Sequence, residues 1–300
     1  MSSAQRPSFA AFATLLLVAL MMGANHVAAR LAFAHGVNVV TAVSARSSLT
    51  ALVVALILWH QCVSWGVSAR HKRFLPLIGA LITIQSVCLY SSVARLPVAL
   101  ALLVFNTYPI TAALWARVFY GHKPERFVVM TMPVMLLGLG LALDVLGATS
   151  GLGAAAHWAE IGLGVAFAIG ASVAFGLAMV LMQYEAGDLD WRLRSFTTMS
   201  QVAIWASLAA TVTGTWALPV DGLGWLGLAL LSLLYGTAFT IMFTVLPKLG
   251  VVGNSPIMNV EPIFALILAW VFLGQAIAPL QLVGAAIVVA TVMALGLRKR

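Results

Sequence analysis

The sequence Asn-Thr-Tyr-Pro at residues 106–109 recurs as Asn-Val-Glu-Pro at 259–262, which lies 153 residues further along the chain. Each copy sits in the middle of an apolar run that ends in Phe-x-Gly, at 119–121 and again at 272–274. Proline removes a backbone donor, and a lipid-exposed helix cannot leave the freed carbonyl unpaired. Two such interruptions at matching positions predict a membrane protein built from a repeat, with a binding site between the two copies.

The rest of the chain has the composition of an integral membrane protein. Hydrophobic residues make up 62% of it and charged residues 8%, and apolar runs of helix length follow one another with short connections. An apolar run of about 20 residues crosses the ~30 Å hydrocarbon core as a helix. We therefore predict an all-α membrane protein with ten transmembrane helices, over residues 9–33, 38–59, 74–94, 98–119, 127–147, 159–184, 196–217, 223–246, 252–273 and 279–297.

A Gly- and Ala-rich link at residues 147–156 separates the first five predicted helices from the last five. It divides the chain into two predicted repeats, at 1–147 and 158–300. Because each repeat has an odd number of helices, the second must cross the membrane in the opposite direction to the first. The Asn-x-x-Pro match pairs the fourth predicted helix with the ninth, and these two run in opposite directions. The sequence therefore predicts an inverted repeat.

The formal charge of +8 is explained by membrane topology and does not require nucleic acid as a partner. If the N-terminus lies in the cytoplasm, most of the basic residues fall on the inner side: Arg6, Arg70, Lys72, Arg73, Arg117, Lys123, Arg126, Arg192, Arg194, Lys248, Arg298, Lys299 and Arg300. Short loops that carry an excess of Lys and Arg face the cytoplasm. Both termini are therefore predicted to be cytoplasmic, and the bilayer itself is an expected partner through its anionic lipids.

Two charged residues fall deep in the predicted membrane, where a charge is a candidate functional residue. Glu261 lies ~15 Å into the ninth predicted helix at 1.5 Å per residue. It could bind a substrate ammonium, exchange a proton, or pair within the protein and brace the break beside it. Arg46 lies ~12 Å below the outer end of the second predicted helix, and it could anchor that helix or bind a substrate carboxylate. Arg30 is nearer the outer end of its helix and is expected to reach the interface.

Four uncharged or weakly basic side chains lie at a similar depth. Asn25 and His26 could line a cavity or form hydrogen bonds to a neighbouring helix. Asn106 and Asn259 could cap the backbone beside the two prolines or face a ligand. We favour the capping role for at least one of them.

Several tyrosine, hydroxyl and amide side chains complete the predicted site. Tyr108 and Tyr235 lie about halfway through their helices, too deep for an interfacial aromatic belt, and are candidates for a cavity wall. Singly, the hydrogen-bonding residues are expected to bridge helices, whereas together they indicate a cavity of mixed polar and apolar lining. The further candidates are Tyr90, Gln85, Ser172 and Thr240.

The whole pattern resembles the EamA branch of the drug/metabolite transporter superfamily, over essentially the entire chain. The segments that carry the resemblance are Met22–His26 and Ala29–Ala32, Ala45-Arg46, Glu261–Ala265 with Phe272–Gln275, and Pro279–Ala286. Two positions depart from the family pattern, since Gln275 and His122 follow glycine where the family has glutamate. These departures leave the predicted fold intact and weaken any mechanism that needs those two carboxylates.

Within the superfamily the chain is most similar to the bacterial aromatic amino acid exporters. The resemblance implies ten helices, an inverted repeat and efflux of amino acids across the bacterial inner membrane. We expect a central cavity formed by the first, third, fourth, sixth, eighth and ninth helices, with bending at Pro109 and Pro262 during alternating access. In this hypothesis Glu261 or the carbonyls freed by the prolines meet the substrate ammonium, and Asn, His or Arg46 meets the carboxylate. The two deep tyrosines meet the side chain.

The sequence lacks the motifs of several other membrane protein classes. It contains no Gly-rich phosphate loop for ATP and no clustered histidines for a metal, so we expect no enzyme activity, metal or cofactor. The internal duplication predicts that a monomer holds a complete site. Three alternatives remain open at this point: an exporter of cationic drugs, an uncoupled facilitator, and a receptor or scaffold that transports nothing.

Overall fold

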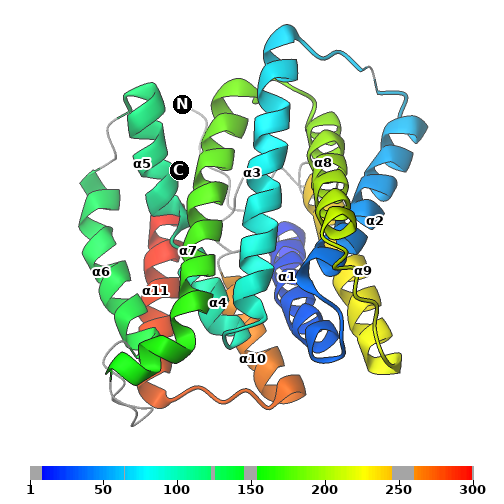
Figure 1. Cartoon of the computed structure of the whole chain (residues 1–300). Helices are drawn as coiled ribbons and strands as arrows, with labels where there is room; N and C mark the ends of the chain where they lie inside the picture. Colours follow the sequence, from blue (N-terminus) through cyan, green and yellow to red (C-terminus); the bar gives the residue numbers. More distant parts are fainter. Residues whose placement is uncertain (1–8, 64, 123–125, 145–153, 245–259, 299–300) are drawn as a thin grey trace.

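The computed structural model describes residues 9–63, 65–122, 126–144, 154–244 and 260–298. Every regular element in these residues is a helix, which confirms the predicted all-α class for the described part of the chain (Figure 1). In chain order the helices are α1 (Phe9–Ala34), α2 (Val39–His60), α3 (Ala69–Val93), α4 (Val98–Phe105), α5 (Tyr108–Tyr120), α6 (Arg126–Ala142), α7 (Ala154–Glu185), α8 (Trp191–Val212), α9 (Gly222–Thr244), α10 (Glu261–Leu273) and α11 (Pro279–Arg298).

Six segments of the described residues are long and apolar enough to cross a membrane: Phe12–Ala34, Val39–His60, Ala69–Val93, Val98–Tyr120, Ala155–Glu185 and Gly222–Met242. Three shorter apolar helices accompany them, at Val129–Ala142, Glu261–Leu273 and Pro279–Ala294. The chain is thus a multi-pass membrane protein.

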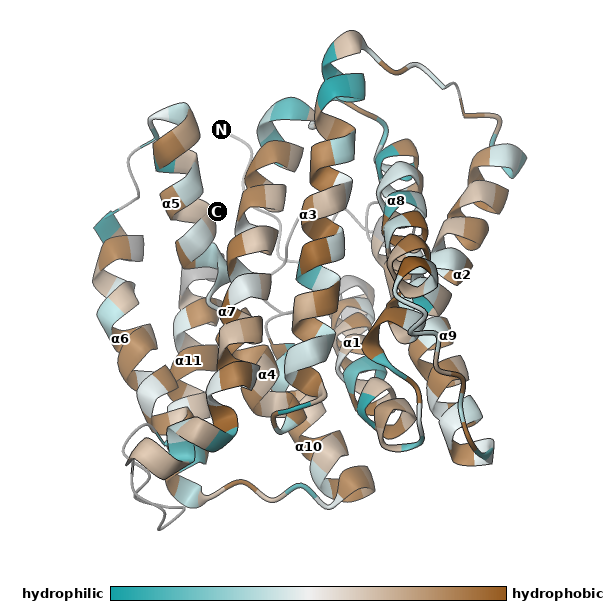
Figure 2. Cartoon of the chain, viewed as in Figure 1, coloured by the Kyte–Doolittle hydropathy of each residue, from teal (hydrophilic) through white to brown (hydrophobic). Residues whose placement is uncertain are grey.

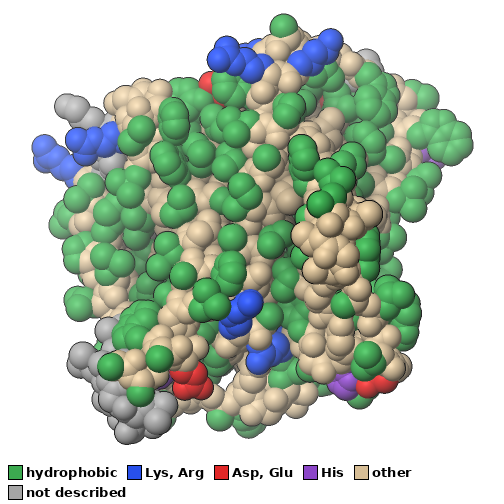
Figure 3. All heavy atoms as spheres, in the orientation of Figure 1, with side chains coloured by type: hydrophobic (Ala, Val, Ile, Leu, Met, Phe, Trp, Pro, Cys, Tyr) green, Lys and Arg blue, Asp and Glu red, His purple; other side chains and the backbone are tan. Residues whose placement is uncertain are grey.

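The outer surface of the bundle is apolar, as a surrounding lipid phase requires. Leu137, Val212 and Trp270 expose 69%, 76% and 64% of their surface. Figure 2 shows hydrophobic residues along the middle of most helices, and Figure 3 shows hydrophobic side chains over the face drawn, with Lys and Arg along its upper edge. A soluble monomer rarely exposes so large an apolar surface.

The first Asn-x-x-Pro segment separates two helices. The single helix predicted over 98–119 is α4 followed by α5, with the break at Asn106 and Thr107. Pro109 is the second residue of α5, where its missing N–H has no partner in any helix. The Asn106 side-chain amide donates to the Leu102 carbonyl at 2.8 Å, so this residue caps the end of α4.

The second segment has the same local geometry where the structure describes it. α10 begins at Glu261 with Pro262 as its second residue, and the preceding Val260 has φ −80° and ψ −4°. The corresponding Thr107 has φ −73° and ψ −4°. Asn259, predicted to match Asn106, lies outside the described residues.

Helices from the two halves of the chain pack side by side throughout the bundle (Figure 1). α1 contacts α9 and α10, α2 contacts α8 and α9, and α3 contacts α7 and α8. In addition, α4 and α5 contact α7, and α6 contacts α11. These pairings bring the deep polar residues of α1, α2 and α3 to the centre of the bundle.

Candidate functional site

Arg46 is the centre of a buried polar network. Its side chain is on α2 and the residue is only 4% exposed. One terminal nitrogen donates to the Tyr90 hydroxyl at 3.3 Å and the other to the Ser86 hydroxyl at 2.9 Å, so α2 is tied to α3. The guanidinium also lies 4.0 Å from the Tyr235 ring centre and 4.8 Å from that of Tyr90. The cation is thus held between two aromatic faces, which attract it electrostatically.

Tyr90 joins this cation to α1. Its hydroxyl donates to Asn25 Oδ1 at 2.9 Å while accepting from Arg46, and both partners are buried. Gln85, on the same helix as Tyr90, accepts a weaker bond of 3.4 Å from the Ser86 hydroxyl. A buried hydroxyl that both donates and accepts fixes the positions of its two neighbours.

His26 and Glu261 form the second half of the network. Glu261 Oε1 lies 3.2 Å from His26 Nε2, and the Glu261 side chain is 21% exposed. The His26 ring in turn lies 5.5 Å from the Tyr90 ring. A continuous chain of contacts therefore runs from the Arg46 cation through Tyr90 and His26 to the Glu261 carboxylate.

Three nitrogen atoms of this network have no hydrogen-bond partner in the part of the chain that the structure describes: Asn25 Nδ2, His26 Nδ1 and Arg46 Nε. Each belongs to a residue that is at most 5% exposed. Leaving a buried polar atom unpaired costs about 1–3 kcal/mol, and most buried polar atoms in native proteins have a partner. Such a group has the hydrogen-bonding capacity to bind a polar ligand or ordered water.

Aromatic side chains border the network on two sides. Tyr235 stacks on Phe239 at 5.8 Å between ring centres, and Phe33 meets the Tyr90 ring edge-on at 6.0 Å. Tyr108 packs edge-on against Phe175 at 4.9 Å, on the side of the bundle where α10 approaches α4. Tyr235 thus lies beside the Arg46 end of the polar chain, and Tyr108 packs against α7.

Other predicted residues lie at helix contacts. Ser172 of α7 meets Thr107 at 3.0 Å between hydroxyl oxygens, and its carbonyl accepts from Thr111 at 2.8 Å. These bonds match the helix-bridging role considered for it. Thr240 donates to the Gly236 carbonyl of its own helix.

Ser86 and Phe33 were missed by the sequence reasoning. A signal for Ser86 existed, because it lies one helical turn before Tyr90 and so shares its face. The Phe33 side chain has no polar atom, so nothing in the sequence indicated that it belongs to the site. Its relevance follows only from the tertiary contact with Tyr90.

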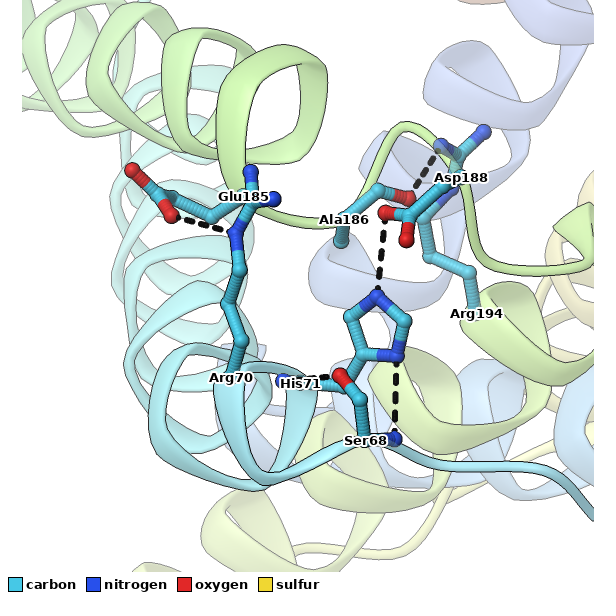
Figure 4. Close-up of polar contacts among 7 residues, drawn as sticks. All are labelled: Ser68, Arg70, His71, Glu185, Ala186, Asp188 and Arg194. Atoms are coloured by element: carbon cyan, nitrogen blue, oxygen red, sulfur yellow. Dashed lines mark hydrogen bonds and ion pairs between the residues drawn. The ribbon is translucent and has the colours of Figure 1, made fainter.

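At one end of the bundle, α3 is tied to the connection between α7 and α8 (Figure 4). His71 Nε2 lies 3.0 Å from Asp188 Oδ1, and His71 Nδ1 accepts from the Ser68 backbone N–H, so the Nε2–H tautomer satisfies both contacts. Arg70 donates to Glu185 at 2.9 Å beside them. The hydrogen bond from His71 holds the pKa of Asp188 below its ordinary value.

A second tie of the same type lies at the opposite end, where α1 finishes and α9 begins. His35 Nδ1 lies 2.6 Å from Asp221 Oδ2. Asp221 also accepts from the Gly224 backbone N–H at 2.8 Å. The backbone bond first, and then the histidine, hold the pKa of Asp221 below its ordinary value.

Comparison with known proteins bears on the class of this site. The EamA-like transporter family matches residues 162–297. The threonine/homoserine exporter RhtA of Escherichia coli (strain K12) is 23% identical over 248 residues, which cover 76% of this chain and 73% of the exporter. The chain belongs to the EamA-like transporters of the drug/metabolite transporter superfamily. The RhtA exporter of E. coli O157:H7 matches this EamA-like chain with the same identity and coverage.

Two further comparisons extend beyond the segment that the EamA-like family matches. A transporter family described by purine nucleobase transmembrane transport matches residues 66–228, more than half of the length, so the chain also belongs with the transporters of that family. A solved crystal structure covers 97% of this chain and 99% of its own, with a TM-score of 0.60 and 16% identity. At that identity the likeness shows the fold alone.

Proposed function

We propose that this chain is a secondary transporter that exports small amphiphilic metabolites, amino acids first among them, by alternating access around the network centred on Arg46. The observation that carries the proposal is the buried chain of contacts from the Arg46 cation to the Glu261 carboxylate. A cation and a carboxylate on opposite sides of one site complement the two charges of a zwitterion. The similarity to a threonine/homoserine exporter supports the same substrate class.

In this proposal the residues of the network and the deep tyrosines have chemical roles. Arg46, Asn25 and His26 donate to the substrate carboxylate, and Glu261 accepts from its ammonium. The Glu261 and His26 side chains separate when the substrate enters, so substrate replaces an internal contact. Tyr90, Tyr108 and Tyr235 contact the substrate side chain, which favours aromatic amino acids as the first substrates to test.

The same proposal includes ten membrane spans arranged as inverted repeats at 1–147 and 158–300, with cytoplasmic termini in a bacterial inner membrane. Helix starts support the repeat: α3, α5 and α6 begin 153 residues before α9, α10 and α11. The packing supports it as well. α1 meets α9 as α7 meets α3, and α1 meets α10 as α7 meets α5, while α2 pairs with α8 and α6 with α11.

Two close helix approaches follow the same 153-residue spacing. A Cβ added at Gly23 of α1 would lie 3.0 Å from the Ala265 backbone nitrogen of α10. A Cβ added at Gly176 of α7 would lie 2.8 Å from the Ala112 backbone nitrogen of α5. Both the glycines and the alanines are repeat equivalents, so the two contacts support a common ancestral packing. Since a single chain supplies both halves, we propose a monomer as the working unit.

The experiment that tests the function is counterflow in proteoliposomes of the purified protein. Vesicles loaded with unlabelled phenylalanine or threonine should accumulate the labelled amino acid from outside, with and without a pH gradient. Glu261→Gln should abolish the accumulation. Glu160→Gln is the matched control, because Glu160 is exposed at the start of α7.

The outcomes separate the alternatives. Counterflow of a quaternary ammonium compound, without amino acids, would support an exporter of cationic drugs. Counterflow of adenine would favour a nucleobase carrier, the second candidate, which the match over residues 66–228 motivates. Amino acid counterflow that ignores the pH gradient would indicate an uncoupled facilitator. No flux of any of these compounds would refute the proposal for all three substrate classes.

A further inference from the structure

A recess of ~510 Å³ opens at the end of the bundle where α1 and α3 finish. Arg30 and Phe33 line it from α1, and Arg95 lines it from the turn after α3. The remaining lining comes from the end of α1, the connection to α2 with its first residue, and Ala94 after α3. This is the predicted outer end of the protein.

The two guanidinium groups are held in place without an acidic partner. Arg30 donates to the Val93 carbonyl at 2.8 Å and Arg95 to the Ser91 carbonyl at 2.8 Å. No ion pair in the described residues includes either arginine. A guanidinium carries five N–H donors and one backbone bond uses one of them. Two fixed cations with spare donors therefore face one recess, an arrangement suited to a carboxylate or a phosphate.

The recess adjoins the buried network through a single aromatic side chain. Phe33 lines the recess, and its ring meets the Tyr90 ring edge-on at 6.0 Å. His26, Arg30 and Phe33 stand at i, i+4 and i+7, so they share one face of α1. Arg30 is four residues beyond His26, which brings it ~6 Å nearer the end of the helix.

We infer that this recess is the outward release site for the substrate, where Arg30 and Arg95 bind its carboxylate after it has passed Phe33. The inference rests on the proposed function, because it takes the substrate from the network around Arg46. The two arginines replace Arg46 as partners of the carboxylate, so the anion is never left without a cation along the path. An anionic lipid headgroup offers the same chemistry, and the test separates these two sources.

The test measures protection of a cysteine at the rim of the recess. In a chain carrying Cys62→Ser and Cys88→Ser, Ala34→Cys places one thiol on the exposed lining of the recess. Phenylalanine at ten times its half-saturating concentration should slow labelling of this thiol by about tenfold in detergent solution. Phenylalanine amide, which lacks the carboxylate, should not.

Two double variants decide which residues bind. Arg30→Gln with Arg95→Gln should abolish the protection, whereas Lys72→Gln with Arg73→Gln removes the same charge from the opposite end and should retain it. Protection that survives loss of both recess arginines would overturn the inference, as would equal protection by the amide. So would protection by added phosphatidylglycerol alone, because the site would then belong to lipid.

Failure of the inference can be told from failure of the proposed function. Counterflow of phenylalanine by the Ala34→Cys protein is measured first in proteoliposomes of phosphatidylcholine. If counterflow is present and the thiol is not protected, the recess is not a release site. If no amino acid is transported by the unmodified chain either, the proposed function itself is wrong and the inference falls with it.

Discussion

At the scale of single residues, Tyr90 connects the elements of the candidate site. Its hydroxyl links Asn25 to Arg46 by two hydrogen bonds, and the whole side chain is buried. Tyr235 also lies beside the Arg46 cation, but its hydroxyl makes only a long contact of 3.9 Å to the Met199 sulfur. A Tyr→Phe substitution therefore removes two hydrogen bonds at Tyr90 and only this long contact at Tyr235.

Tyr90→Phe should destabilise the protein by about 1–3 kcal/mol, because it leaves Asn25 Oδ1 and one Arg46 nitrogen buried without that partner. Tyr235→Phe should change stability by less than about 0.5 kcal/mol, since it removes no strong hydrogen bond. Denaturant unfolding of the detergent-solubilised protein measures both. If both variants lowered the free energy of unfolding equally, the Tyr90 hydroxyl would not be a stabilising link between Asn25 and Arg46.

At the scale of helices, the bundle depends on two close approaches and two end ties. Gly23 and Gly176 allow α10 and α5 to approach α1 and α7 closely enough for backbone contact. The two His–Asp ties hold helix ends at opposite sides of the bundle. These features fix which helices are neighbours at each membrane face.

Gly23→Ala and Gly176→Ala should each destabilise the protein by about 1–3 kcal/mol, because the added methyl group meets backbone that cannot rotate away. Gly222→Ala is the matched control, since a Cβ at this helix start meets nothing within 4 Å. Thermal unfolding followed by circular dichroism compares the three. Helix propensity favours alanine over glycine, so it would oppose the expected loss. Destabilisation by Gly222→Ala of the same size would show that the losses at Gly23 and Gly176 do not come from their close packing.

The end ties should respond to acid. The folded-state pKa values of Asp188 and Asp221 lie below their ordinary values, so the ties are fully present above the unfolded-state value of ~3.9. They are lost as the pH falls through the lower folded-state values. The difference in Tm between the parent and an Asp188→Asn, Asp221→Asn variant should therefore persist at pH 5 and close below about pH 4. If the parent and the variant had the same Tm at both pH 7 and pH 5, the ties would have no role in stability.

At the scale of the whole molecule, the two His–Asp ties are candidates for gates. Asp188 stands 153 residues after His35, and Asp221 stands 153 residues after Ser68, which caps the helix of His71. Each tie thus joins matching regions of the repeat, with His35 and Asp188 at equivalent positions, whereas His71 corresponds to Gly224, three residues after Asp221. A transporter that opens alternately at its two faces has to release one such tie at a time.

Crosslinking tests this requirement. In the Cys62→Ser, Cys88→Ser background, a His35→Cys, Asp221→Cys pair joined by a short reducible thiol crosslinker should stop counterflow, and a reductant should restore it. The His71→Cys, Asp188→Cys pair should behave alike at the other face. If both crosslinks form and counterflow continues, the ends of these helices do not separate during transport.

The sequence by itself determined the membrane class, the helical architecture and the deep polar residues, because apolar run length and isolated charges are local properties that read directly from the chain. It also predicted a helix cap for at least one of Asn106 and Asn259, and Asn106 has that role. It could not predict that Pro109 begins a new helix, since that depends on how α7 supports the break. Nor could it show that Glu261 meets His26 while Arg46 lies between two tyrosines. Those contacts join α1, α2, α3, α9 and α10, and only the packing of helices far apart in the sequence decides which side chains become neighbours.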